Sequence, residues 1–337
     1  MPAATDPFNC GRCGHSCLGG QCVDKKCKSV VVKGGLENPT DLVADANHVY
    51  VALYGSDRVV RIAKNGGLMD VLVSGHVDAH GVTLGGGKLF WANLDYAGTG
   101  TDGYWGGVWG CTLPACADTD QVTQGDNVAY VRFSNDHLFF TERSPGEALT
   151  WVTRDGVDKD NLAFPTDPWS VAVDESHVYF QFAGGLSRVS VAGGPIQPVG
   201  ESQSFADNGF ITLDADRVYW AFSDVGGSGE TGRVYSALKS NLAAPIVKYG
   251  TNNARPNGVA VDATTLYWTN EGTLTSSTSN GDGKVLACPK QGCQGEPVVL
   301  EEGLVLPRTI VADGDALYFI VRGNGTTAGE LRRLAKP

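Results

Sequence analysis

Long apolar runs, basic runs and helical periodicity are all missing from this chain of 337 residues. No stretch of about 18 apolar residues occurs, so we expect no transmembrane segment. There are 26 lysines and arginines against 37 acidic residues, and the net charge is −11. Nucleic acids and anionic membranes attract proteins with a concentrated basic face, which this chain lacks. We therefore expect neither of them as a partner.

Common catalytic motifs are also missing. The chain has no GxSxG nucleophile elbow, no Walker loop and no GxGxxG followed by a helical pattern. Charged residues make up only 19% of the chain, whereas there are 45 glycines. This balance is typical of short strands joined by many tight turns. It leaves open whether the protein is an enzyme.

The chain contains seven copies of one short pattern. Each copy begins with an apolar stretch, which in most copies ends at an aspartate. Three turn residues follow, and then a second apolar stretch that contains aromatic residues. The copies lie 40 to 51 residues apart and end in Tyr50, Phe90, Phe139, Tyr179, Tyr219, Tyr267 and Tyr318. Such a period, built only of short strands, indicates an all-β fold, a seven-bladed β-propeller with one four-stranded blade per repeat. The expected blades span about residues 36–75, 76–125, 126–165, 166–200, 201–250, 251–300 and 301–337.

The first and last strands of this propeller are predicted to pair with each other. The seventh repeat ends without a fourth strand, and residues 28–33, centred on Val31, form a strand that belongs to no repeat. Their pairing would leave no open sheet edge at the seam. The expected organisation is a disulfide-rich segment at residues 1–27 and a propeller at 28–337, with residues 28–33 completing the last blade.

Nine cysteines are many for a chain of this length. Two CxxxxC pairs occupy equivalent repeat positions, and each is predicted to close the hairpin between a third and a fourth strand as a disulfide: Cys111 with Cys116, and Cys288 with Cys293. The glycine-rich leading cluster also favours disulfides over a zinc or iron–sulfur site. The pairing within it stays open among Cys10, Cys13, Cys17, Cys22 and Cys27.

Disulfides indicate an oxidising compartment, so we expect a secreted or cell-surface protein. Residues 1–9 have neither the basic start nor the apolar core of a signal peptide. We expect the natural signal and some further sequence to precede residue 1, and that sequence could hold a partner for the odd cysteine of the cluster.

One face of the disc should carry the binding site. Strands alternate in direction within a blade, so the starts of the first strands and the ends of the second strands meet around the mouth of the central channel. Residues at these positions differ from repeat to repeat, and such variation is typical of a binding surface. We expect a monomer that captures a small molecule, glycan or peptide there, with Trp169, Tyr130 and Arg308 as anchors. The other candidates are Asp41, His80, Asn93, Arg143, Asn257 and, in a long loop, Trp105.

Two further hypotheses use the same fold. A divalent-metal-assisted hydrolase or lyase would hold Ca²⁺ or Mg²⁺ and use His80 as a general base. Its candidate ligands are Asp41, Asn93, Glu142 and Asn270. A protein-interaction platform would instead expose an apolar patch on the disc. The repeated aspartates Asp45, Asp174, Asp214, Asp262 and Asp313 are interpreted as turn-forming residues.

The leading segment from Asn9 to Cys17 resembles the NCGxCGxxC knob that precedes propellers in secreted or lipid-anchored bacterial surface proteins. The repeat core, as in Pro256-Asn257-Gly258-Val259-Ala260-Val261-Asp262, resembles the repeats of the same proteins. The resemblance covers almost the whole chain and implies the fold and export. More distantly, the chain is similar to gluconolactonase-like and streptogramin-lyase-like propellers, a resemblance that implies a divalent cation held by Glu and Asn ligands in the channel.

Overall fold

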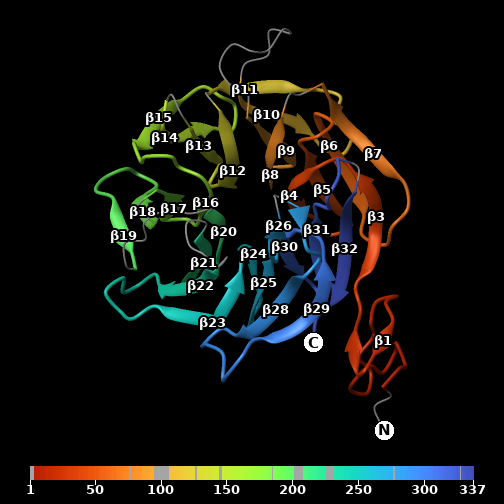
Figure 1. Cartoon of the computed structure of the whole chain (residues 1–337). Helices are drawn as coiled ribbons and strands as arrows, with labels where there is room; N and C mark the ends of the chain where they lie inside the picture. Colours follow the sequence, from red (N-terminus) through yellow and green to blue (C-terminus); the bar gives the residue numbers. More distant parts are fainter. Residues whose placement is uncertain are drawn as a thin grey trace.

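Seven four-stranded antiparallel sheets surround a central channel in the computed structural model (Figure 1). The structure describes residues 4–75, 78–94, 106–125, 127–143, 146–183, 185–200, 208–224, 231–275, 278–326 and 328–337. In that part of the chain no helix is long and apolar enough to cross a membrane. The predicted seven-bladed propeller is confirmed.

Each of the first three blades runs along the sequence from the channel to the rim. The first blade contains β4 (Pro39–Ala44), β5 (His48–Leu53), β6 (Arg58–Ala63) and β7 (Met69–Ser74). The second contains β8 (Ala79–Gly85), β9 (Lys88–Asn93), β10 (Gly107–Thr112) and β11 (Asp120–Gln124). The third contains β12 (Val128–Ser134), β13 (His137–Glu142), β14 (Ala148–Thr153) and β15 (Lys159–Ala163).

The next three blades repeat this order. The fourth contains β16 (Val171–Val173), β17 (His177–Phe182), β18 (Gly185–Ser190) and β19 (Gln197–Val199). The fifth contains β20 (Asn208–Leu213), β21 (Arg217–Asp224), β22 (Thr231–Leu238) and β23 (Val247–Ala254). The sixth contains β24 (Pro256–Val261), β25 (Thr265–Asn270), β28 (Gly283–Pro289) and β29 (Val298–Leu304), with a small hairpin of β26 (Leu274–Thr275) and β27 (Thr278–Ser279) inserted.

The seventh blade joins the two ends of the chain. Its strands β30 (Pro307–Asp313), β31 (Ala316–Val321) and β32 (Gly329–Ala335) are followed at the rim by β3 (Val30–Leu36). Val31 pairs with Arg332, and Lys33 pairs with Leu331. Figure 1 shows β3 beside β32. The predicted closure is confirmed, although the closing strand starts at Val30 and continues to Leu36 rather than spanning 28–33.

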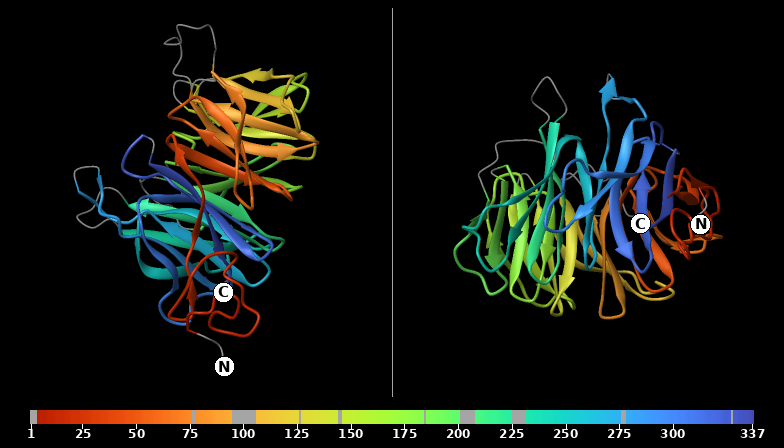
Figure 2. Two further views of the ribbon diagram at one scale, coloured as in Figure 1. Left: turned by 90° about the vertical axis from the view of Figure 1, so that its right-hand side faces the viewer. Right: turned by 90° about the horizontal axis from the view of Figure 1, so that it is seen from below.

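Large aromatic side chains fill the space between neighbouring blades. Trp91 and Trp268, at the same repeat position, are fully buried, as are Phe140, Phe180 and Phe319. Burying one such side chain contributes roughly 1.5–3 kcal/mol. The blades therefore stand side by side as one thick disc (Figure 2).

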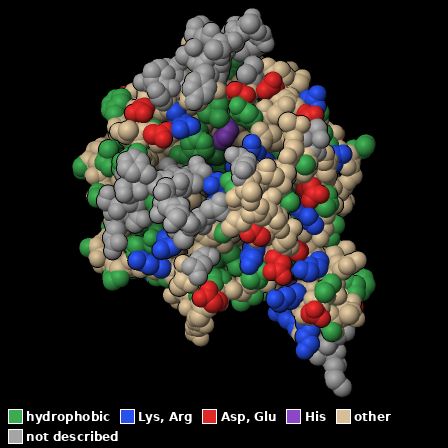
Figure 3. All heavy atoms as spheres, in the orientation of Figure 1, with side chains coloured by type: hydrophobic (Ala, Val, Ile, Leu, Met, Phe, Trp, Pro, Cys, Tyr) green, Lys and Arg blue, Asp and Glu red, His purple; other side chains and the backbone are tan. Residues whose placement is uncertain are grey.

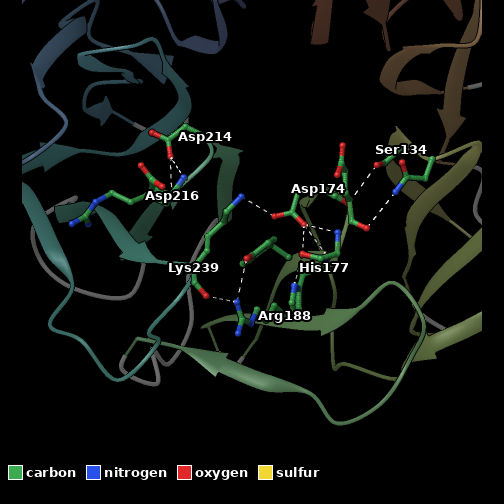
Figure 4. A network of polar contacts seen from close by, with 12 residues as sticks. Ser134, Asp174, His177, Arg188, Asp214, Asp216 and Lys239 are labelled. Atoms are coloured by element: carbon green, nitrogen blue, oxygen red, sulfur yellow. Dashed lines mark hydrogen bonds and ion pairs between the residues drawn. The ribbon is translucent and has the colours of Figure 1, made fainter.

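The repeated aspartates lie at the turn after the first strand of a blade, on the face of the disc that we call the lower face. The Oδ1 atom of Asp174 accepts hydrogen bonds from the backbone N–H groups of Ser176 and His177, at 2.8 and 2.9 Å. Its Oδ2 atom lies 2.8 Å from Nζ of Lys239, which follows the third strand of the next blade (Figure 4). The same lysine–aspartate contact between blades recurs in the pairs Lys290–Asp214, Lys336–Asp262 and Lys64–Asp313. We call these four contacts the inter-blade ion pairs.

The N-terminal segment packs against the rim of the sixth and seventh blades. It contains the hairpin of β1 (Cys22–Val23) and β2 (Lys26–Cys27) and the disulfides Cys10–Cys22 and Cys17–Cys27. The disulfides join the core formed by these two blades. The fifth cysteine of the cluster, Cys13, is exposed and free. Both predicted hairpin disulfides, Cys111–Cys116 and Cys288–Cys293, are present.

Candidate functional site

In six of the seven blades the first strand carries an irregularity where it enters the channel. Its pairing with the second strand shifts register close to its start, for example between Ala79 and Val82 and between Val128 and Val131. A bulge adds a residue and turns side chains away from the regular alternation. These bulges hold the variable residues of the repeat, and they direct them toward the face opposite the inter-blade ion pairs. We call this face the upper face.

The channel mouth is the set of side chains that surround the channel on the upper face. Its described members are Tyr54, His80, Tyr130, Arg143, Trp169, Phe210, Asn257, Glu271, Arg308 and Arg322. They come from all seven blades or from the loops between them. Figure 3 shows a hollow near the centre of the ring where hydrophobic, basic and histidine side chains gather.

One half of the channel mouth is aromatic. His80 of β8 lies 4.8 Å from the ring of Tyr130 of β12 and 5.8 Å from the ring of Trp169, between centroids. Tyr130 also contacts Phe210 of β20, at 5.0 Å. All these contacts are edge-to-face, the arrangement that aromatic quadrupoles favour. Four consecutive blades therefore contribute to one fixed aromatic cluster, in which Trp169 remains partly exposed.

The other half of the channel mouth is built around one buried carboxylate. Glu271 follows β25, and its side chain is only 3% exposed. Its Oε1 atom lies 2.9 Å from Nε of Arg308, and its Oε2 atom lies 3.1 Å from Nη2 of Arg255. Asn257 donates a further hydrogen bond to Oε1, at 3.2 Å. A single negative charge is thus shared between two guanidinium groups.

Two more arginines lie at the channel mouth, Arg143 on the aromatic half and Arg322 beside Arg308. The guanidinium of Arg143 lies over the ring of Trp169 at 4.4 Å and pairs with Asp167 at 2.6 Å. Arg322, directly after β31, donates a hydrogen bond from Nε to Asn38. Burial lowers the pKa of Arg322, and the nearby charge of Arg308 lowers it further. The two guanidinium groups therefore repel each other inside the site.

His80 is neutral in this environment. Burial lowers its pKa to about 3, and the positive charges of Arg308 and Arg143 contribute to that shift. Its Nδ1 atom lies 3.2 Å from the carbonyl oxygen of Ala129, so the proton is assigned to Nδ1 and the Nε2 atom keeps its lone pair. A general base works best with a pKa near the working pH. This histidine is therefore suited to accepting a hydrogen bond rather than to removing a proton.

The two acidic members of the predicted metal set already bind protein cations. Asp41 is fully buried and lies 3.0 Å from Nη1 of Arg132, which lines a channel cavity of about 170 Å³. Burial raises the pKa of Asp41, although Arg132 opposes that effect. Glu142 accepts a hydrogen bond from Thr150 at 2.8 Å and lies 3.3 Å from Nζ of Lys159. These partners belong to the outer strands β14 and β15, away from the channel.

The amide members of that set are buried at the ends of β9 and β25. Asn270 donates to Asn253 of the preceding blade at 3.3 Å, and Asn93 is buried at the end of β9. Asp41 and Glu142 thus have protein counter-ions, and the four-residue cation site stays a prediction. In the ranges that the structure describes, the one group of histidine, cysteine and acidic residues with metal-ligand spacing is Cys10, Cys17 and Cys27, all of them in disulfides.

The structure brings together five of the sequence-predicted ligand-binding residues: His80, Tyr130, Arg143, Trp169 and Arg308. Asn257 lies beside Glu271, whereas Trp105 falls outside the described residues. Sequence reasoning missed Tyr54 and Arg255. Glu271 and Arg322 follow the second strands of their blades, so the repeat predicted them at the channel mouth, although they were not chosen as ligand-binding candidates.

Large exposed hydrophobic side chains do not form one patch in the described part of the chain. Leu68, Val71 and Tyr54 belong to the first blade, and Val31 lies in β3 of the seventh. Others are spread over the third, fourth and sixth blades, at Val157, Phe164, Ile196 and Val298. Phe8 and Val23 belong to the N-terminal segment. This scatter gives no support to a single apolar docking face.

No protein-family model matches this chain, and no curated protein matches its sequence. Its fold is similar to that of many solved structures. Virginiamycin B lyase from Staphylococcus aureus has a TM-score of 0.63 and 13% identity, over 92% of this chain and 99% of that one. The WD40 β-propeller domain of Doa1 has a TM-score of 0.65 and 12% identity, over 92% of this chain and 96% of that one. U3-55K has a TM-score of 0.67 and 11% identity, over 91% of this chain and 98% of that one. At such identities the likeness shows the fold alone.

Proposed function

We propose that this protein is an exported binding propeller that captures a small molecule, glycan or peptide at the channel mouth. The observation that carries the proposal is the aromatic cluster, to which four consecutive blades contribute His80, Tyr130, Trp169 and Phe210. Trp169 offers the partly exposed aromatic surface of the cluster. Aromatic walls with a few placed polar groups are typical of ligand sites.

Preorganisation supports this interpretation. Tyr130 is held between His80 and Phe210, and Arg143 is fixed between the Trp169 ring and Asp167. Side chains that are already ordered lose little conformational entropy when a ligand binds. The bulges at the starts of the first strands are part of the backbone sheets, so they support the site as rigid elements.

Capture is favoured over catalysis by the state of the candidate catalytic groups. His80 is neutral and weakly basic, and the carboxylates of Asp41 and Glu142 are paired with Arg132 and Lys159. A hydrolytic metal site would require these groups to leave their partners. Export is supported by the four disulfides, which form and persist in oxidising compartments.

The test is a binding screen with matched tryptophan variants. Glycans, short peptides and small aromatic compounds are screened by ligand-observed NMR against the wild type, Trp169→Ala and Trp151→Ala. Trp151 is a partly buried tryptophan of β14 that packs on His137 and lies outside the channel mouth. We expect at least one compound that binds the wild type and Trp151→Ala and loses at least tenfold in affinity for Trp169→Ala. Binding that is unaffected by the Trp169 change, or no binding in any class, would reject the proposal.

A further inference from the structure

Arg308 and Arg322 place two positive charges near each other at the channel mouth. Among the described residues, the carboxylate nearest to Arg308 is that of Glu271, which also pairs with Arg255. The whole chain carries −11, so this concentration opposes the overall charge. We propose that the captured ligand carries a carboxylate, which Arg308 and Arg322 receive. This inference rests on the proposed capture function and specifies its ligand class.

Arg308 and Arg322 have hydrogen-bond donors to spare. The Nε atom of Arg308 lies 2.9 Å from Glu271 but without hydrogen-bond alignment, and the terminal nitrogens of Arg308 donate to no described group. Arg322 uses Nε for Asn38, and its terminal nitrogens likewise have no described acceptor. Nε of Arg308 is buried without a hydrogen bond, which is costly. An oxyanion between the two side chains would supply the missing acceptors.

The electrostatics point in the same direction. Burial and the nearby charge of Arg308 lower the pKa of Arg322, and Arg308 also disfavours a proton on His80. An anionic group would relieve both effects at once. Field focusing by the channel walls would also attract an anionic ligand to a protein that is otherwise acidic.

Geometry favours a carboxylate on a ring. The guanidinium fork matches a carboxylate with two parallel hydrogen bonds, and Glu271 already shows that the site accommodates this group beside Arg308 and Arg255. The aromatic half provides the opposite wall, where the partly exposed Trp169, supported by Tyr130, can contact a sugar or aromatic ring. A ring that bears one carboxylate, such as a uronic acid unit of an acidic glycan, would satisfy both halves.

The experiment compares acidic probes with neutral partners of the same shape. Calorimetry measures binding of a galacturonate trisaccharide and its methyl ester, and of para-hydroxybenzoate and its amide. A hexose phosphate and the free hexose show whether the anion recognised is a phosphate instead. The protein variants are Arg308→Gln, Arg322→Gln, Trp169→Ala and, as control, Arg154→Gln. Arg154 pairs with Asp136 on the lower face, so its loss changes the net charge equally without touching the channel mouth.

We expect an acidic carboxylate probe to bind at least tenfold more tightly than its neutral partner. Arg308→Gln and Arg322→Gln should each lower the ratio of acidic-probe to neutral-probe affinity about tenfold, whereas Arg154→Gln should leave this ratio unchanged. Added salt should weaken binding of the acidic probe and leave binding of the neutral probe unchanged. The carboxylate inference is overturned if the acidic and the neutral probe bind equally well and the arginine variants bind them as the wild type does. If Trp169→Ala also loses this binding, the proposed capture function still stands. Preference for the phosphate overturns the carboxylate assignment, and no binding by any probe rejects both proposals.

Discussion

The inter-blade ion pair between Lys239 and Asp174 should contribute measurably to the stability of the ring. Lys239→Met removes the charge and keeps most of the apolar side chain, so the change isolates the contact at 2.8 Å. Burial alone would raise the pKa of Asp174. The bond from Lys239 and the turn N–H groups of Ser176 and His177 lower it to about 2, against an ordinary 3.8.

The size of the effect follows from that pKa. A tenfold change in an equilibrium constant is about 1.4 kcal/mol, so lowering the pKa from 3.8 to about 2 stabilises the fold by at most roughly 2.5 kcal/mol. The lysine accounts for only part of it, because the turn N–H groups remain in the variant. The side chains are 16% and 22% exposed, so solvent screens the pair. We expect Lys239→Met to lower the free energy of unfolding by about 1 kcal/mol at neutral pH.

The pH dependence supplies the decisive signature. The folded pKa of Asp174 is below the unfolded value, so its contribution is complete above pH 3.8 and is lost as the pH falls through about 2. The difference between wild type and Lys239→Met in urea unfolding should therefore be constant near neutral pH and shrink between pH 4 and 2. Asp174→Asn in a double-mutant cycle isolates the pair, and exposed Lys248→Met serves as the control. A coupling near zero, or a difference unchanged at low pH, would refute the reasoning.

Three other predictions concern the seam, the histidine and the metal hypothesis. Leu36→Ala removes a fully buried side chain of the closing strand and should lower the free energy of unfolding by about 2–5 kcal/mol in denaturant titrations. Leu68 is 88% exposed, so Leu68→Ala should change this free energy very little. Similar losses in the two variants would contradict the closure as a source of stability. The ring NMR shifts of His80 should not titrate between pH 5 and 8, because its pKa is about 3, and a midpoint near 6.5 would contradict the described burial. Addition of a chelator, Ca²⁺ or Mg²⁺ should leave the melting temperature unchanged, because Asp41 and Glu142 pair with Arg132 and Lys159. A clear rise with either ion would support the metal hypothesis.

Charge pairing is the feature of the metal candidates that the sequence could not show. Asp41 and Glu142 occupy variable positions near the channel, which made both plausible ligands. Their partners Arg132 and Lys159 lie 91 and 17 residues away along the chain. No local spacing encodes such a contact, so only the folded structure could reveal that these carboxylates already have counter-ions.

The sequence by itself determined the seven-fold repeat, the closing strand, the hairpin disulfides and the face where unusual side chains gather. These features follow from local periodicity and from the alternation of strands, which depend on neighbours along the chain. Only the tertiary structure decided the pairing of the leading cysteines, the meeting of His80 with Tyr130 and Trp169, and the sharing of Glu271 between Arg255 and Arg308. Contacts between blades depend on bulges and burial across the ring, and these arise when distant repeats pack together.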